Sequence, residues 1–368
     1  MPSQEAGKPI SLFTGFPGFI GMRLLPRLLE LQPEVSFECL VQERFLGAAR
    51  TSIGEIEARH THVRGRIGTV VGDITLANLG LPERDAVKLR RNLVGAYHLA
   101  AVYDLAVRRE VGMRINVEGT RNVLEFLAGA PRLQRLHYVS TAYVSGKATG
   151  IFRESDLDVG QGFKNHYEET KFLAEVEVVR SGIPTTTYRP GIVVGDSRTG
   201  ATGKFDGPYF VLTAMERVPS PGAFVRVGSG RNPVNLVPVD FVVEALARLS
   251  SRAAGEGGKT YHLTDPQPIS AQEIAELFAQ CLGKAFAYLP LPLSLAKRFF
   301  APGAVQRFFG MPAEHLDYFD HPCRYDATEA TRDLQALGIT CPRFPEYVEK
   351  LVAFYRANQG TVRREAMI

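Results

Sequence analysis

The sequence predicts an α/β fold: a doubly wound parallel sheet with helices on both faces, followed by a smaller, mainly helical lobe toward the C-terminus. Short apolar, β-branched runs alternate with segments of helical period through the first half of the chain. A glycine-rich turn follows the first such run, and after residue 195 the alternation gives way to a stretch rich in Gly and Pro. At 368 residues, 45% of them hydrophobic, the chain can bury a core of this size.

The first half supplies the strands of the expected sheet and the helices between them. In Gly112–Leu127 and Asn165–Arg180 the apolar residues fall near one face, as helices that lie on a sheet require. Pro26 would kink the first helix if that helix runs unbroken, and the sequence leaves this open. The strands are expected at Pro9–Thr14, Val35–Val41, Thr69–Val71, Ala96–Ala101, Leu136–Thr141 and Thr185–Val194.

The second half is expected to leave the sheet and return to it. Asp196–Asn232 is rich in Gly, Pro and Ser and predicts an irregular excursion, while Val237–Leu249 predicts a helix and Thr260–Leu263 a strand. We therefore assign residues 1–198 and 233–264 to a first domain, 199–232 and 265–345 to a second lobe, and 346–368 to a C-terminal helix and tail. Later helices are expected at Ile269–Leu282, Leu293–Phe309 and Phe344–Asn358.

Charge and cysteine content narrow the class of protein. A formal net charge of +4, spread along the chain, does not indicate a nucleic-acid partner. The N-terminus lacks the pattern of a secretory signal, and the most apolar stretch, Leu289–Phe309, is broken by prolines, Lys297 and Arg298. We expect a cytoplasmic protein without a transmembrane segment. No CxxC spacing occurs among the four cysteines, Cys39, Cys281, Cys323 and Cys341.

The turn TGFPGFIG at Thr14–Gly21 lies between the first strand and the first helix. Glycines there allow a sharp turn and a close approach of the backbone to a pyrophosphate, and the free N–H groups of the helix favour its charge. An ordinary glycine-rich loop is the alternative, which the strand before and the helix after disfavour. The turn predicts a Rossmann dinucleotide site with contacts from Gly15, Phe16, Pro17, Gly18, Phe19 and Ile20.

Two later strand ends are expected to contact the same cofactor. Asp73, with Ile74 beside it, could accept hydrogen bonds from an adenine amino group, or could instead cap a helix. Ala100 and Ala101 have small side chains that would let a cofactor lie against the strand tip, although tight packing explains them almost equally well.

The end of the second strand usually selects between NAD and NADP. Gln42 stands where an acid would bind the ribose hydroxyls of NAD, and Arg44 and Arg50 could bind the additional phosphate of NADP. The sequence therefore slightly favours NADP(H) over NAD(H).

Tyr167 and Lys171 are four residues apart, so on a helix they project from one face. A phenol ionises near pH 10, and a nearby ammonium together with an oxidised nicotinamide cation should lower the pKa of Tyr167 into the range for acid/base catalysis. Taken alone, a surface Tyr and Lys would be the simpler interpretation. The preceding strand ends in Ser140 and Thr141, and because strand side chains alternate, only one hydroxyl can face a substrate.

These motifs, with HLAA, NVEGT, VSTAYVSG, YEETK and YRPGIVVG in that order, resemble the extended short-chain dehydrogenases/reductases from residue 9 to about 265. The resemblance implies that Thr141 and Tyr167 are catalytic and that Lys171 holds the ribose. It also implies a catalytic role for Asn116 and places Pro190, Ile192 and Val193 beside the nicotinamide. CLVQERFLGAAR, VVGDIT and GITCPRFPEYVEKLV are most similar to the fatty-acyl thioester reductase, or male-sterility, branch. Dimers are frequent in the family, so a homodimer is expected as one possibility.

The second lobe concentrates aromatic residues, which favours a small lipophilic substrate, although core packing explains about half of them. The segments RFF at 298–300 and 307–309 could instead touch a membrane surface or a partner. The aromatic residues are Phe205, Tyr209, Phe210, Phe224, Phe286, Tyr288, Phe299, Phe300, Phe308, Phe309 and Phe319.

The spacing of His315, Asp317, His321 and Cys323 matches no zinc site, so no metal is expected. His60 and His62 are interpreted as surface residues.

Three functions follow from these observations. The favoured one is an oxidoreductase that moves hydride from NAD(P)H to the carbonyl of a lipophilic ketone, aldehyde or acyl thioester. The second is an epimerase, isomerase or lyase that uses bound NAD(P) transiently. The third, a binding protein with a vestigial site, is disfavoured by the intact Thr141, Tyr167 and Lys171.

Overall fold

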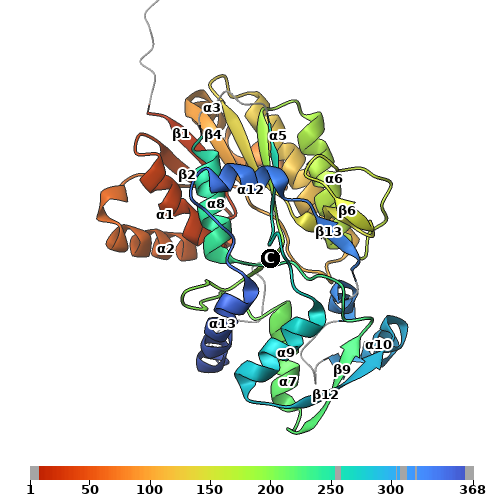
Figure 1. Ribbon diagram of the computed structural model, residues 1–368. Coiled ribbons are helices and arrows are strands. Elements are labelled where there is room, and N and C mark those ends of the chain that lie inside the picture. Colours follow the sequence, from red (N-terminus) through yellow and green to blue (C-terminus); the bar gives the residue numbers. More distant parts are fainter. Residues whose placement is uncertain (1–7, 253–257, 304, 307–312, 320, 361–368) are drawn as a thin grey trace, which may run out of the picture.

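The computed structural model describes residues 8–252, 258–303, 305–306, 313–319 and 321–360. Its centre is a parallel sheet of seven strands in the order β11-β7-β5-β4-β1-β2-β3 (Figure 1). After β1 the chain builds β2 and β3 on one side and β4 on the other, so the carboxyl ends of β1 and β4 border the crevice where such sheets bind ligands. The strands are β1 Ile10–Thr14, β2 Ser36–Val41, β3 Ile67–Val71, β4 Leu93–His98, β5 Arg135–Val139, β7 Thr185–Pro190 and β11 Thr260–Leu263.

Helices cover both faces of this sheet, as the sequence predicts (Figure 1). Side chains alternate along β1, so that Phe13 enters the hydrophobic core on one face and Leu12 the core on the other. The Phe13 face is covered by α1 Gly21–Leu31, α2 Leu46–Arg59, α8 Val239–Ser250 and α12 Thr328–Gln335, and the Leu12 face by α3 Glu83–Asn92, α5 Gly119–Ala128 and α6 His166–Arg180.

Two of the expected helices differ in detail from the simple pattern. α1 runs without interruption through Pro26, and the buried Leu24, Leu25, Leu28 and Leu29 anchor it to the sheet. The segment expected as one helix over Gly112–Leu127 consists of α4 Arg109–Gly112, the wider π-helical turn η4 Met113–Glu118, and α5. Such wide turns inside helices are frequent at functional sites.

Several predicted strand ends are wrong. β4 and β5 end at His98 and Val139, so Ala100, Ala101, Ser140 and Thr141 lie in the loops that follow. The stretch expected as one strand over Thr185–Val194 divides at Gly191 into β7 and β8 Ile192–Val194, which pairs with β10 Leu236–Pro238. A Cβ on Gly191 would lie 2.6 Å from the carbonyl oxygen of Asn235, so the chain can turn this closely only at glycine.

The second lobe contains more regular structure than the sequence predicts. Asp196–Asn232, expected to be irregular, contains α7 Pro208–Arg217 and β9 Gly222–Val227, which pairs in parallel with β12 Phe286–Leu291. The single helix expected at Leu293–Phe309 is wrong, because α10 Leu293–Phe300 ends before residues 301 and 302, which are not helical. Residues 304 and 307–309 lie outside the described residues. The other elements are α9 Ala271–Leu282, η6 Ala313–Tyr318 and α13 Phe344–Asn358.

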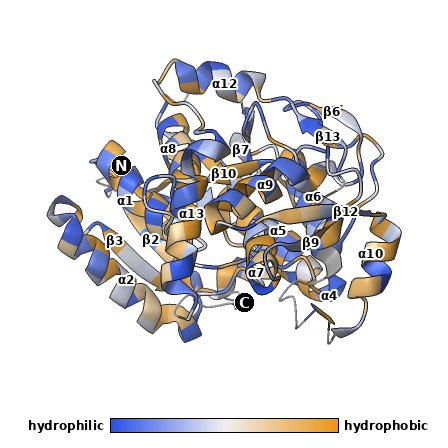
Figure 2. Ribbon diagram, turned by 60° about the horizontal axis from the view of Figure 1, so that its bottom comes forward, coloured by the Kyte–Doolittle hydropathy of each residue, from blue (hydrophilic) through white to orange (hydrophobic). Residues whose placement is uncertain are grey.

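Hydrophobic residues hold this lobe together. Phe278 of α9 and Tyr347 of α13 belong to one core cluster with Tyr209 of α7. A further strand pair, β6 Gly150–Phe152 with β13 Cys323–Tyr325, lies beside α6. In Figure 2, β12 is largely hydrophobic, whereas α12 shows mixed hydropathy. Among the helices that the structure describes, none combines the length and apolarity needed to cross a membrane.

Candidate active site

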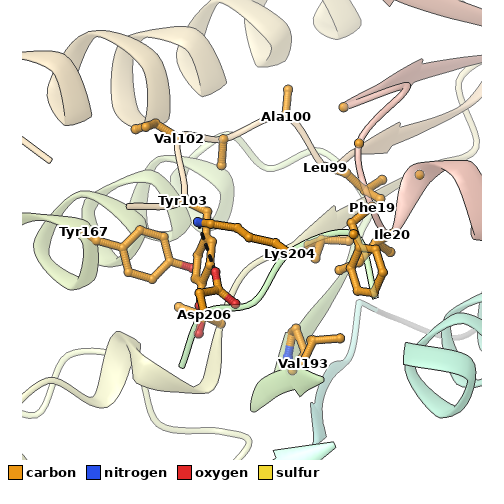
Figure 3. Close-up of a pocket in the computed structure, with 18 of the residues that line it drawn as sticks. Phe19, Ile20, Leu99, Ala100, Val102, Tyr103, Tyr167, Val193, Lys204 and Asp206 are labelled. Carbon is orange, nitrogen blue, oxygen red and sulfur yellow. Dashed lines mark ion pairs between the residues drawn. The ribbon is translucent and has the colours of Figure 1, made fainter. Parts of the chain in front are cut away.

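One large cavity, of about 1510 Å³, opens at the carboxyl ends of the strands and extends to the second lobe. Pockets for a single small molecule usually measure about 300–1,000 Å³, so this one has room for a dinucleotide and a substrate. It is lined by nearly every residue predicted to contact the cofactor, together with Thr141, Tyr167 and Lys171. Figure 3 shows the part of it between Phe19 and Ile20 of the glycine turn and Tyr167 of α6.

The glycine turn leaves no room for a side chain at Gly15 or Gly18. Gly15 has φ +86°, and a Cβ there would lie 2.9 Å from the backbone nitrogen of Ala100. A Cβ on Gly18 would lie 2.7 Å from the carbonyl oxygen of Gly15. The Thr14 hydroxyl accepts hydrogen bonds from the backbone N–H groups of Leu99 and Ala100 at 3.2 and 3.1 Å, which joins the ends of β1 and β4. Backbone thus comes directly to the cavity wall, and the turn fits a dinucleotide pyrophosphate.

The cavity residues near the end of β2 form a hydrogen-bonded chain. Arg44 Nε donates to Gln42 Oε1 at 2.9 Å, and Gln42 Nε2 donates to Asp73 Oδ2 at 2.8 Å. Asp73 Oδ1 accepts from the backbone N–H and the hydroxyl of Thr75, so this carboxylate caps its own turn as well as lining the cavity. Arg59, which the sequence analysis missed, also lines the cavity from the last turn of α2, whereas Arg50 does not.

Lys171 is buried in the wall of the cavity, one turn after Tyr167 on α6. The helix begins where Asn165 Oδ1 accepts from the backbone N–H of Glu168 at 3.0 Å. Lys171 Nζ donates to the Tyr138 hydroxyl at 3.0 Å and to the Val139 carbonyl oxygen at 2.9 Å. Burial lowers the pKa of Lys171 to about 8, because the surroundings disfavour the charged ammonium.

Tyr167 is 7% exposed and faces the cavity (Figure 3). Burial raises the pKa of Tyr167, and a side-chain hydrogen bond with Thr141 lowers it in part. Lys171 alone does not make this phenol acidic in the arrangement described, because desolvation has the larger effect and the ammonium is hydrogen-bonded to Tyr138 and Val139. The part of the expectation that rests on an oxidised nicotinamide stays a prediction.

The two hydroxyls after β5 have separate partners. Thr141 Oγ1 accepts from the backbone N–H of Tyr143 at 3.3 Å and also lowers the pKa of Tyr167 by a side-chain hydrogen bond. Ser140 donates to Glu175 Oε2, and Glu175 Oε1 accepts from Arg189 at 2.6 and 2.9 Å. Thr141 is thus the hydroxyl at the phenol, and Ser140 belongs to a buried ionic network.

Asn116 does not line the cavity. Its Oδ1 accepts from the backbone N–H of Val102 at 2.8 Å, and its Nδ2 donates to the Thr170 hydroxyl at 3.0 Å. It therefore joins the loop after β4 to α6, and the role implied by the resemblance stays a prediction.

Sequence reasoning missed three residues beside Tyr167. The ring of Tyr103 meets the Tyr167 ring edge-on, with 5.3 Å between centroids. Lys204 Nζ lies 5.5 Å from the centre of the Tyr103 ring and 3.0 Å from Asp206 Oδ2 (Figure 3). All three line the cavity. They come from irregular segments without a periodic signal, and only the pair of charges in a Gly-rich stretch distinguishes Lys204 and Asp206 in sequence.

The substrate side of the cavity is apolar, but its wall is not the predicted set of aromatics. Of the predicted aromatic residues that the structure describes, Phe319 lines the cavity. Others, such as Phe205 and Tyr209, pack in the core of the second lobe. The apolar wall consists instead of Tyr143, Val211, Val234, Leu236, Ile274, Tyr318 and Phe319.

The histidines do not gather as a metal site in the described part of the cavity. Asp317 pairs with Lys297 at 2.6 Å, and His321 hydrogen-bonds with the Tyr325 hydroxyl at 3.2 Å. Within the described part of the chain, one group of three such side chains lies close enough to share an ion: Glu30, His60 and His62 on the surface, whose ligand atoms are within 4.8 Å of one another.

Comparison with known proteins identifies the family. A family model described as male sterility protein matches residues 13–246. A component of the linear gramicidin synthase of Brevibacillus parabrevis is 27% identical over 96% of this chain, which spans only 7% of that protein. Fatty acyl-CoA reductase 1 of Arabidopsis thaliana is 24% identical over 76% of this chain and 72% of its own length.

Solved structures agree with this assignment. The terminal R domain from the myxalamid PKS-NRPS biosynthetic pathway has a TM-score of 0.79 and 25% identity, with 100% of this chain and 95% of that chain covered. DesIV, a dTDP-glucose 4,6-dehydratase from Streptomyces venezuelae solved with NAD, has a TM-score of 0.65 at 20% identity over 95% of this chain and 98% of that one, and shares the fold. The chain belongs to the male sterility protein family and is an NAD(P)-dependent oxidoreductase of the extended short-chain dehydrogenase/reductase type.

Proposed function

We propose that this chain uses NADPH to reduce the thioester of a lipophilic acyl group to the aldehyde. The observation that carries the proposal is the continuous cavity, which joins the glycine turn to Thr141, Tyr167 and Lys171 and continues along the apolar wall of the second lobe. Fatty acyl-CoA reductases among the relatives support a thioester carbonyl as the group reduced.

The residues suit the chemistry of carbonyl reduction. When bound, the nicotinamide cofactor supplies a hydride to the carbonyl carbon. The buried phenol of Tyr167 is held in its protonated form by its raised pKa, and it donates that proton to the carbonyl oxygen. Thr141 orients the same oxygen by a hydrogen bond, and Lys171 fixes the wall behind the phenol through Tyr138 and Val139.

Release of the thiol completes the reaction. The carbon–sulfur bond of the resulting hemithioacetal breaks, its hydroxyl proton returns to Tyr167, and the electron pair leaves with sulfur. The aldehyde and the thiolate are the products, and the thiolate takes up a proton from solvent to become the thiol.

The preference for NADPH over NADH is part of the proposal. Arg44, just after β2, and Arg59, in the last turn of α2, both line the cavity, and Gln42 stands where an acid would bind the ribose of NAD. A homodimer remains an expectation that sedimentation would test.

Turnover of the purified protein tests this function. Oxidation of NADPH and of NADH is followed with acyl thioesters of increasing chain length, with the corresponding aldehydes and with aromatic ketones. We expect NADPH oxidation that requires a thioester and yields one aldehyde per cofactor consumed. Turnover without net cofactor consumption would instead indicate an epimerase or lyase.

A further inference from the structure

A charged pair crosses the cavity between the cofactor turn and the catalytic tyrosine. Lys204 and Asp206 lie on the segment that leads from β8 into α7, and their side chains are 29% and 18% exposed. The segment rests on the cofactor turn, because a Cβ on Gly203 would lie 3.2 Å from the ring of Phe19. It ends at Gly207, whose φ is +56°, directly before α7.

The pair is aimed at the reacting centre. Figure 3 shows the Lys204 chain extended toward Tyr103, with Asp206 below it and Tyr167 on the far side of the Tyr103 ring. The 5.5 Å from Lys204 Nζ to the Tyr103 ring and the 5.3 Å between the two rings leave the ammonium one aromatic ring away from Tyr167.

Two opposite charges in a largely apolar cavity require an explanation. Removing an ion pair from water carries a desolvation penalty that the attraction between the charges only partly offsets. Burial raises the pKa of Asp206 and the Lys204 ammonium lowers it, so the carboxylate depends on that partner. Together the two side chains present an N–H donor and a carboxylate acceptor 3.0 Å apart.

We propose that Lys204 and Asp206 recognise an amide in the thiol arm of the substrate. Lys204 donates to the amide carbonyl oxygen, and Asp206, 3.0 Å from Lys204 Nζ, holds the ammonium in position for that bond. In a pantetheine thioester the nearest amide is separated from the reacting carbon by the sulfur and two methylenes, which matches a pair placed one ring beyond Tyr167. The acyl chain packs against the apolar wall, which includes Val211, Val234 and Ile274.

This inference rests on the proposed thioester reduction and extends it to specificity. The aldehyde product has lost the thiol and with it the amide. The pair therefore favours the thioester over the free aldehyde in a cavity whose apolar wall accepts both.

The test compares three substrates with one acyl chain: the decanoyl thioester of pantetheine, the decanoyl thioester of propanethiol, and decanal. In Lys204→Met, kcat/KM for the pantetheine thioester is expected to fall by about 10- to 100-fold, as for loss of a hydrogen bond to a charged group. The other two substrates should change by less than about twofold. Asp206→Asn should show the same pattern, and Lys88→Met on the surface of α3 is the matched control.

An equal loss with all three substrates would overturn the inference, because the pair would then serve the fold or the cofactor. NADPH binding by fluorescence and the melting temperature check those two roles directly. If the wild-type protein reduces decanal but neither thioester, the proposed function fails, and the inference is tested separately by free pantetheine as an inhibitor of decanal reduction. That inhibition should weaken in Lys204→Met, and equal inhibition of both proteins would contradict a recognition role.

Discussion

At the scale of single residues, burial gives two side chains of the site pKa values that differ from their values in water. The Tyr167 phenol is kept protonated and the Lys171 ammonium is made easier to deprotonate by the same desolvation, which raises the pKa of the first and lowers the pKa of the second. The Tyr167 phenol therefore enters the reaction with its proton in place, as the donor in a reduction must.

Tyr167→Phe removes that proton donor and little else. We expect kcat to fall by about 10²- to 10⁴-fold, the usual contribution of general acid–base catalysis, while the affinity for NADPH changes by less than about twofold. Steady-state kinetics and cofactor fluorescence measure the two effects. Undiminished turnover in this variant would refute the assigned mechanism.

Lys171 should make stability depend on pH. Its pKa of about 8 in the folded protein lies below the value of about 10.4 for an unfolded lysine, so between these pH values the unfolded chain binds more protons. The free energy of unfolding of the wild type, relative to Lys171→Met, should therefore rise by a few kcal/mol from pH 8 to pH 10. Urea denaturation of both proteins across this range measures the difference, and a constant or falling difference would contradict it.

At the scale of elements, short segments are fixed by close backbone contacts and by distant caps. The glycine turn is an example of the first. α12 is an example of the second, since Glu154 Oε2 accepts from the Glu329 backbone N–H at 2.7 Å and Oε1 from that of Ala330 at 3.0 Å. The cap comes from a residue 175 positions earlier in the chain.

Gly15→Ala tests the turn. A Cβ at this position would meet the backbone of Ala100 and Leu99 at 2.9 Å, and φ +86° is unfavourable for alanine. We expect the affinity for NADPH to fall at least about 10-fold, with a melting temperature lowered by several degrees. Gly54→Ala, which would contact nothing within 4 Å, is the control that should bind normally.

Glu154→Ala tests the distant cap. Two backbone N–H groups of α12 and that of His262 would lose their acceptor, so the free energy of unfolding should fall by about 2–4 kcal/mol. Glu154→Gln retains one acceptor oxygen and should lose less. Equal stability of the alanine variant and the wild type would show that the cap contributes nothing.

At the scale of the whole molecule, a buried network of hydrogen bonds joins the second lobe to the start of α6. The Tyr318 hydroxyl donates to Glu168 Oε1 at 2.8 Å and accepts from Asn165 Nδ2 at 3.0 Å. Lys164 Nζ completes the network at 3.0 Å from the same carboxylate oxygen. The lobe that forms the apolar wall is thus attached to the start of α6, beside Tyr167.

Tyr318→Phe should loosen this attachment. We expect KM for the acyl substrate to rise several-fold with a smaller change in kcat, because the wall is displaced while Thr141 and Tyr167 remain in place. The control is the affinity for NADPH, which should be unchanged. A fall in kcat alone would mean that Tyr318 acts on the chemical step.

The sequence predicts those parts of the site whose chemistry is local. The glycine turn and the Tyr167–Lys171 pair are readable because spacing within one segment determines their geometry. Tyr103, Lys204, Asp206 and the cap from Glu154 escape prediction, since their partners are brought together only by the packing of segments far apart in sequence. The helix α7 within residues 196–232 is not predicted for a related reason: its buried residues pack against the core of the second lobe, which is formed by segments far away in sequence.

The glycine turn has a kinetic consequence. One turn holds one dinucleotide, so only one pair of electrons can be delivered before the oxidised nucleotide must depart. Any further reduction to an alcohol would have to wait for that exchange, which occurs in the same open volume that the aldehyde occupies. The aldehyde should then be able to escape between the two steps, and hydroxylamine added during turnover should capture it as the oxime.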